Sequence, residues 1–221
     1  MDTELQYAEA INPRCHYVAG VRLVPFCVGH AVLLTRLQNP FRVLWSGDEE
    51  ALKKTEVGSG DLAQALWVCS RPATTAMSTI DRWWTPWGIR RIHARLLREG
   101  LIASLGRMYQ YLGHGFTGPR LARTPDAKTT SGAPLLAMLM SSLTAHFGKS
   151  TDEALNTPLA TALWDRAAYL EQQGLIRFWT KEDEELLDWA KQLSADPELL
   201  ESMFAEADRR REKTEEEHGR N

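Results

Sequence analysis

The chain has 221 residues, of which 43% are hydrophobic and 25% are charged, and its formal net charge is −3. This composition is typical of one globular domain, or one domain with an appendage, and excludes a disordered or fibrous chain. No apolar run approaches the roughly 18 residues that a membrane-spanning helix needs, so no membrane association is expected. The acidic first residues lack the pattern of a signal peptide.

Three cysteines, Cys15, Cys27 and Cys69, lie far apart and show no paired spacing. An odd number of cysteines without a disulfide framework indicates reduced thiols that are mostly buried. The expected location is therefore the cytoplasm.

The beginning of the chain predicts a β element followed by a helix. Residues 1–14 are polar and are expected to be loosely held. Alternation over 16–24, with a candidate turn at residues 19–20, predicts a short hairpin or an extended arm. A helix is predicted over 27–37. It contains His30, for which a hydrogen-bonded histidine is expected rather than a metal ligand, because no second ligand is spaced near it.

Helical spacing and capping residues predict further helices over 62–69 and 73–80, from 81 or 85 to 99, and over 101–112. The segment 85–99 has the strongest amphipathic pattern among them. Its inward side chains are predicted to be Trp87, Ile89, Ile92, Leu96 and Leu97, and its outward side chains to be Arg90, Arg91, Arg95 and Arg98.

Tryptophan and arginine are concentrated around this helix. Residues 82–123 contain eight arginines and a single acidic residue, a net charge of +7, with Trp83, Trp84 and Trp87 among them. The first interpretation is a helix with a solvated arginine face and tryptophans in the core. A protein-binding surface is the second, since Trp and Arg are common interface hot spots. Nucleic-acid binding by phosphate contacts and base stacking is the third.

A stretch rich in Gly, Pro, Ser and Thr over 113–134 is the clearest break in the chain. Loops of this length are uncommon inside compact domains and are often linkers. The sequence therefore predicts one domain or two loosely joined halves, made of an N-terminal helical part with a short β element (1–112), a flexible linker or loop (113–134), a C-terminal helical part (135–207) and a charged tail (208–221).

The region that follows has the clearest helix signals. Gly148 is predicted to end a helix in the left-handed conformation, and Ser150 and Glu153 form a predicted capping box. Thr157 with Pro158 is predicted to be an N-cap followed by proline at the first helical position. Leu159, Leu163 and Leu170 are expected on the buried face of that helix, and Gly174 is expected to end it.

The C-terminal end is acidic. A helix is predicted after Thr180, with Leu186 and Trp189 in its apolar stripe, and a last helix over 197–207. The tail over 208–221 is charged at nearly every position and is expected to fray or be disordered. Residues 180–221 carry fourteen acidic and seven basic residues, a net charge of −7, which makes nucleic-acid binding a less favoured function.

A family resemblance rests on a glycine and a hydroxyl cap, an acidic pair, a Leu-x-x-Pro-Leu motif and an aromatic helix that ends in glycine. The residues are Gly148, Ser150, Asp152, Glu153, Leu155, Pro158, Leu159, Trp164, Tyr169 and Gly174. This segment, mainly 148–174, resembles the tail assembly chaperones of tailed phages and prophages. The resemblance implies a protein that coats a long, aggregation-prone helical partner, the tape measure protein, in the host cytoplasm.

No arrangement of residues predicts an enzyme, a metal site or a cofactor. Residues 113–118 match G-x-G-x-x-G, but a dinucleotide site needs a strand before the glycines and a helix after them. Here a helix is predicted before them and Pro119 follows. The six histidines are scattered, and the paired acids lie at helix starts, where the helix dipole favours them.

The sequence thus predicts a mainly α, bundle-like multi-helix fold with a short N-terminal β hairpin or extended arm. The favoured function is a non-enzymatic tail assembly chaperone that binds a protein partner, with a homo-oligomer left open. The alternative is a small nucleic-acid-binding or regulatory protein that uses 81–99. The candidate protein-binding residues are Trp83, Trp84, Trp87, Arg90, Arg91, Arg95, Trp164 and Tyr169.

Overall fold

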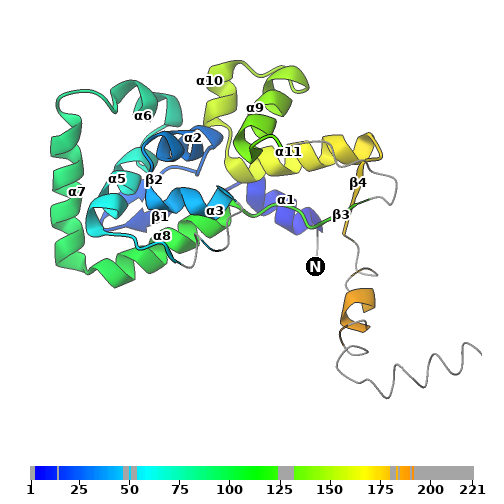
Figure 1. The fold of residues 1–221 in the computed structure, drawn as a ribbon, viewed down its shortest axis with the longest axis horizontal. Coiled ribbons are helices and arrows are strands. Elements are labelled where there is room, and N and C mark those ends of the chain that lie inside the picture. The colour runs from blue at the N-terminus through cyan, green and yellow to red at the C-terminus, as the bar shows by residue number, and fades with distance from the viewer. Residues whose placement is uncertain are drawn as a thin grey trace, which may run out of the picture. The chain divides into compact units, whose positions relative to one another are not determined.

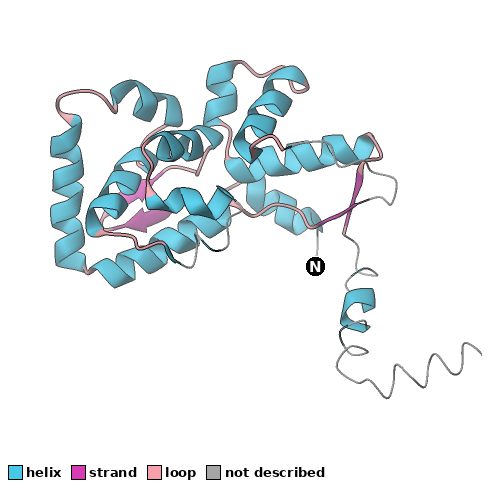
Figure 2. Ribbon diagram, in the orientation of Figure 1, coloured by secondary structure: helices cyan, strands magenta, loops and turns pink. Residues whose placement is uncertain are grey.

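The computed structural model describes residues 3–13, 15–46, 50, 54–123, 132–179, 183, 185–189 and 191. The fold is mainly helical, with a small antiparallel hairpin near the N-terminus, which confirms the predicted fold class (Figures 1 and 2). Two units are distinguished, residues 2–178 and residues 179–221. Every element whose bounds are given below lies in the first unit.

The predicted hairpin is confirmed. Strands β1 (His16–Val18) and β2 (Val21–Leu23) pair antiparallel, with Val18 opposite Val21. Ala19 and Gly20 have φ values of 50° and 63°, so both turn residues adopt the left-handed conformation that two-residue hairpin turns need.

Residues 1–14 were expected to be loose, and that expectation is wrong. Residues 3–11 form α1 (Thr3–Ile11), which packs on α11 (Leu159–Gln172). Thr161 Oγ1 donates a hydrogen bond to the Ala10 carbonyl at 3.2 Å, and the Tyr7 ring lies 5.6 Å from Trp164. The helix is stabilised by a partner 151 positions away in the chain, which local patterns do not reveal.

The following elements are α2 (Val28–Arg36), η1 (Pro40–Arg42), α3 (Val43–Ser46), α5 (Ser59–Cys69), α6 (Ala73–Thr79), α7 (Thr85–Glu99) and α8 (Leu101–Gly115). Helices α2 and α5 supply the centre of the core, where Leu33, Leu34, Leu62 and Leu66 are fully buried. Gly29 lets α2 approach its neighbours closely. A Cβ atom there would lie 2.7 Å from Ala73 Cβ and 2.8 Å from the Leu155 carbonyl oxygen.

His30 is hydrogen-bonded, as predicted, and the structure buries it in the core. Its Nδ1 accepts a hydrogen bond from the Cys27 backbone N–H at 3.1 Å, so its Nε2 carries the proton and donates to the Arg71 carbonyl at 2.8 Å. Both ring nitrogens of the neutral imidazole are thereby satisfied. Burial lowers the pKa of His30 from 6.5 to about 4.

The second half of the unit contains β3 (Leu121–Arg123), α9 (Leu135–Ala145), α10 (Thr151–Asn156), α11 and β4 (Ile176–Phe178). Strands β3 and β4 pair antiparallel, and neither was predicted. Three-residue strands carry almost no periodicity of their own, so their pairing is set by the elements that bring them together.

The predicted division between 1–112 and 135–207 is not a boundary between units. Helix α8 continues to Gly115, and α2 contacts both α9 and α10. Two backbone hydrogen bonds join the halves: the Val28 N–H donates to the Thr157 carbonyl at 3.0 Å, and the Leu159 N–H donates to the Phe26 carbonyl at 2.7 Å. Residues 124–131 of the predicted linker lie outside the described residues.

Most predicted helix ends between α9 and β4 are confirmed. Gly148 and Gly174 have φ values of 64° and 69°. Ser150 Oγ accepts from the Glu153 N–H at 3.3 Å, and a Glu153 carboxylate oxygen accepts from the Ser150 N–H at 2.8 Å, which completes the capping box. Thr157 is not an N-cap, however. Its hydroxyl donates to the Glu153 carbonyl at 2.8 Å, and Pro158 takes the N-cap position of α11.

Helix α11 is buried mainly through small side chains. Leu159 is buried as predicted, but Leu163 and Leu170 are only half-buried. The other buried positions are Ala160, Ala162, Trp164 and Ala167. Helices α1, α8 and α9 all contact α11. Because these helices approach α11 closely on several sides, its buried positions hold small alanine side chains rather than one stripe of leucines.

Helical residues are present at 183, 185–189 and 191, within the helix predicted after residue 180. Leu186 and Trp189, its predicted apolar stripe, are 61% and 48% exposed. The predicted helix over 197–207 and the tail over 208–221 lie outside the described residues. Within the described part of the chain, no helix has the length and apolar character needed to cross a membrane.

The three thiols are expected to differ sharply in reactivity. Cys15 is exposed, whereas Cys27 and Cys69 are buried, and burial raises the pKa of both buried thiols to about 12. The thiolate is the reactive form, so only Cys15 should react at neutral pH. Ellman titration should give one thiol per folded chain and three after denaturation. More than one rapidly reacting thiol in the folded protein would contradict this packing.

Candidate protein-binding surface on helix α7

The inner face of α7 is fixed by a close contact with α5. Thr85, Ile92 and Leu96 are buried, as predicted for Ile92 and Leu96. Gly88 lies against the indole of Trp67, where an added Cβ would be 2.7 Å from Nε1. A side chain at this position would push the two helices apart, so glycine sets both the separation and the rotation of α7.

The rotation of α7 places its tryptophans outside. Trp83, Trp84 and Trp87 are 79%, 45% and 70% exposed, and Leu97 is 66% exposed. The prediction that Trp87 and Leu97 face inward is therefore wrong, as is the interpretation that placed the tryptophans in the core. Successive helical residues are about 100° apart, so a helix that turns Gly88 towards α5 turns its neighbour Trp87 away.

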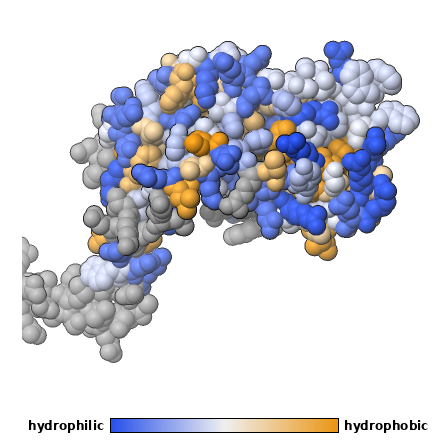
Figure 3. Space-filling view, turned by 180° about the vertical axis from the view of Figure 1, so that it is seen from behind, coloured by the Kyte–Doolittle hydropathy of each residue, from blue (hydrophilic) through white to orange (hydrophobic). Residues whose placement is uncertain are grey.

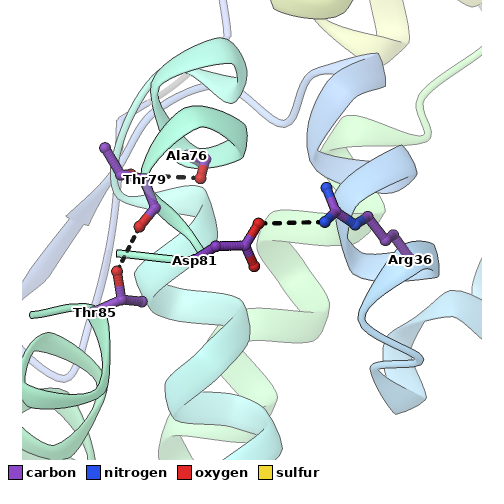
Figure 4. A network of polar contacts seen from close by, with 5 residues as sticks. All are labelled: Arg36, Ala76, Thr79, Asp81 and Thr85. Carbon is purple, nitrogen blue, oxygen red and sulfur yellow. Dashed lines mark hydrogen bonds and ion pairs between the residues drawn. The ribbon is translucent and has the colours of Figure 1, made fainter. Parts of the chain in front are cut away.

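Polar contacts anchor the turn that leads into α7 (Figure 4). Thr85 Oγ1 donates to the Thr79 carbonyl at 2.6 Å, and Thr79 Oγ1 donates to the Ala76 carbonyl at 3.4 Å. Asp81 forms an ion pair with Arg36 at 3.3 Å. This pair is mostly exposed and contributes little to stability, but the buried Thr85 contact holds the turn in place. The exposed indoles of Trp83 and Trp84 thus project from a fixed turn.

The arginines of α7 border these indoles. Arg90, Arg91 and Arg98 are exposed and Arg95 is half-buried. Among the described residues, no carboxylate lies within ion-pair distance of Arg90, Arg91 or Arg95. The two nearest acids in sequence are engaged elsewhere, Asp81 with Arg36 and Glu99 with Arg107. The outward face of α7 therefore carries positive charge that the described residues do not neutralise.

Figure 3 views the molecule from behind, with the edge that contains α7 on the right. Hydrophilic colours dominate that edge, and hydrophobic residues form separate patches. Tryptophan is slightly hydrophilic on this scale, so the exposed indoles add aromatic area that the hydropathy colouring does not emphasise.

The other two candidate residues do not belong to this surface. Trp164 is only 4% exposed, and its indole N–H donates to the Thr117 carbonyl at 3.1 Å. It is a core residue of α11, so its assignment as a binding residue is wrong. Tyr169 is half-buried and stacks on His146 with ring centroids 4.2 Å apart. Helices α7 and α11 lie at opposite ends of unit 2–178 in Figure 1.

The structure also forms a small cavity that the sequence did not predict. It has a volume of about 100 Å³ and is lined by Glu9, His16, Phe26, Tyr111 and His114, among others. Nδ1 of His114 and Nε2 of His16 are 3.0 Å apart. These histidines are 98 positions apart in the chain, so no local spacing could have paired them. Within the described ranges, no three His, Cys, Asp or Glu side chains are grouped so as to hold a metal ion.

No protein-family model matches this chain, and neither a curated protein nor a solved structure was found to be similar to it.

Proposed function

We propose that this protein is a non-enzymatic binding protein of phage or prophage tail assembly, which acts in the cytoplasm and binds the helical tape measure protein. One observation carries the proposal: Trp83, in the turn before α7, and Trp87, on its outward face, are 79% and 70% exposed, beside arginines that have no carboxylate partner among the described residues. Trp and Arg are among the residues most enriched at interface hot spots. The resemblance of 148–174 to tail assembly chaperones supplies the biological setting.

A solvated position is costly for indoles of this size. Burying apolar surface yields roughly 25 cal/mol per Å², and a tryptophan that packs against a partner buries on the order of 150–250 Å². Binding of a partner that buries these neighbouring exposed tryptophans is therefore strongly favourable. Rigid aromatic side chains also lose little conformational entropy on binding, which favours a protein-binding role.

Nucleic-acid binding is a second candidate function. The observation that favours it is the absence, among the described residues, of carboxylate partners for Arg90, Arg91 and Arg95 next to indoles that could stack on bases. The net charge of −7 over residues 180–221 opposes it. Phosphate binding weakens steeply with salt, so a salt titration separates the two functions.

The proposed function is tested by aggregation of a tape measure protein from the same genome, followed by light scattering. Wild-type protein should suppress the aggregation, and the double variant Trp83→Ala/Trp87→Ala should lose most of this effect. Tyr17→Ala is the matched control, because Tyr17 is an aromatic residue with 59% exposure on β1. Suppression by the double variant at the wild-type level would contradict the proposal.

A further inference from the structure

The exposed apolar residues of α7 continue as a stripe beyond the tryptophans. Trp87, Ala94 and Leu97 recur at helical spacing along the outward face. Two further exposed apolar side chains lie near the helix ends: Trp83 in the turn before α7, and Ile102, 87% exposed, in the first turn of α8 after Gly100. At 1.5 Å per residue, the part from Trp87 to Leu97 is about 15 Å long.

The geometry of this stripe restricts the kind of partner. The backbone N–H and C=O groups within α7 are paired along the helix, so an added strand would find no hydrogen-bonding edge. Helix α7 therefore offers a partner only its side chains, arranged along a line. An amphipathic helix lying along α7 matches such a line, because its own apolar residues recur with the same period.

The charge on the same face restricts the partner further, because Arg90 lies within the line of the stripe and Arg91 and Arg98 lie beside it. Arg90, Arg91 and Arg98 share the outward face, and the first two have no carboxylate partner among the described residues. A second copy of this chain would place arginine against arginine in a two-fold contact, which like-charge repulsion disfavours. A partner with acidic residues beside its apolar stripe would neutralise these charges.

We infer that α7 binds an acidic amphipathic helix of a partner protein, whose apolar face covers Trp87 and Leu97 while its carboxylates pair with Arg90, Arg91 and Arg98. The inference rests on the proposed function and adds the secondary structure and the charge of the bound segment. Apolar contact supplies most of the affinity, and the ion pairs select acidic helices over basic ones.

The test uses the full chain and three fluorescein-labelled probes, with binding followed by anisotropy. The first probe is a designed helical peptide with a leucine stripe flanked by glutamates. The second is the same peptide with lysine at every glutamate position, and the third is an oligo-dT strand. The acidic peptide should bind at least about tenfold more tightly than the basic peptide, a difference of about 1.4 kcal/mol.

Substitutions then locate the site. Arg90→Glu/Arg91→Glu should weaken binding of the acidic peptide at least about tenfold and make the basic peptide the tighter binder of the two. Trp87→Ala should weaken the binding of both peptides. Arg42→Glu, a charge reversal at another exposed arginine, should change neither affinity. All substituted side chains are exposed, and thermal unfolding of each variant checks that it is folded.

The outcomes separate this inference from the proposed function. Equal binding of both peptides, lost in Trp87→Ala, would overturn the acidic partner and leave a protein-binding surface. Binding of oligo-dT alone, with a steep dependence on salt, would overturn both. If none of the three probes binds, the inference is overturned. The proposed function is then tested separately by the suppression of tape measure aggregation.

Discussion

Replacing Gly29 by alanine is expected to destabilise the protein by about 3 kcal/mol, at the upper end of the usual cost of overpacking. The added methyl group would lie 2.7 Å from Ala73 Cβ and 2.8 Å from the Leu155 carbonyl oxygen. One of these atoms is main chain, so a rotamer change cannot relieve the overlap. Helices α6 and α10 must both move away from α2, and each movement opens space in the core.

The control is Gly106→Ala, in the middle of α8. A Cβ atom there has no neighbour within 4 Å, so the substitution adds helix propensity without an overlap. Alanine should stabilise the helix by about 0.5–1 kcal/mol relative to glycine. The free energies of unfolding are measured in denaturant with equal slopes. A smaller loss for Gly29→Ala than about 1 kcal/mol would show that α2 is not packed as described.

Lowering the pH from 6.5 to 4 is expected to remove about 3 kcal/mol of stability through His30 alone, at 1.36 kcal/mol for each unit of pKa difference. Burial lowers the pKa of His30 from 6.5 to about 4, so the unfolded chain binds a proton in this range before the folded protein does. The contribution is complete above pH 6.5, and it is lost as the pH falls towards 4.

A variant separates this effect from the carboxylates, which also titrate below pH 5. In His30→Asn the amide oxygen can still accept from the Cys27 N–H, but no group titrates at this position. The variant should be less stable than the wild type at neutral pH, and its stability should fall by about 3 kcal/mol less on acidification. Parallel stability curves for the two proteins between pH 6.5 and 4 would rule out the neutral, buried imidazole.

The helices whose ends are marked locally could be predicted from the sequence. Gly148, Ser150, Glu153 and Gly174 each act through neighbours within a few residues, and the structure has all four in their predicted roles. Thr157 shows the limit of this approach. Its hydroxyl could serve the helix before it or the helix after it, and only the three-dimensional packing selects the first.

The candidate surface was predicted in composition but not in orientation. The apolar pattern of 85–99 assigned Trp87 to the same buried face as Ile92. The pattern alone does not show which element the helix packs against, so it does not show which side chains face that element. The contact between Gly88 and Trp67 decides the rotation of α7, and it joins residues of two different helices. The burial of Trp164 and the pairing of His16 with His114 also depend on contacts between distant segments.

The pairing of α1 with α11 has a consequence for synthesis on the ribosome. Helix α1 packs on α11, and the Phe26 carbonyl accepts a hydrogen bond from the Leu159 N–H. The first segments of the unit therefore cannot form these contacts until residues more than 130 positions later have been synthesised. Domains that are emerging from the ribosome expose apolar surface until their last contacts can form. A truncated nascent chain that lacks α11 would leave α1 without its docking site and the core open on that side.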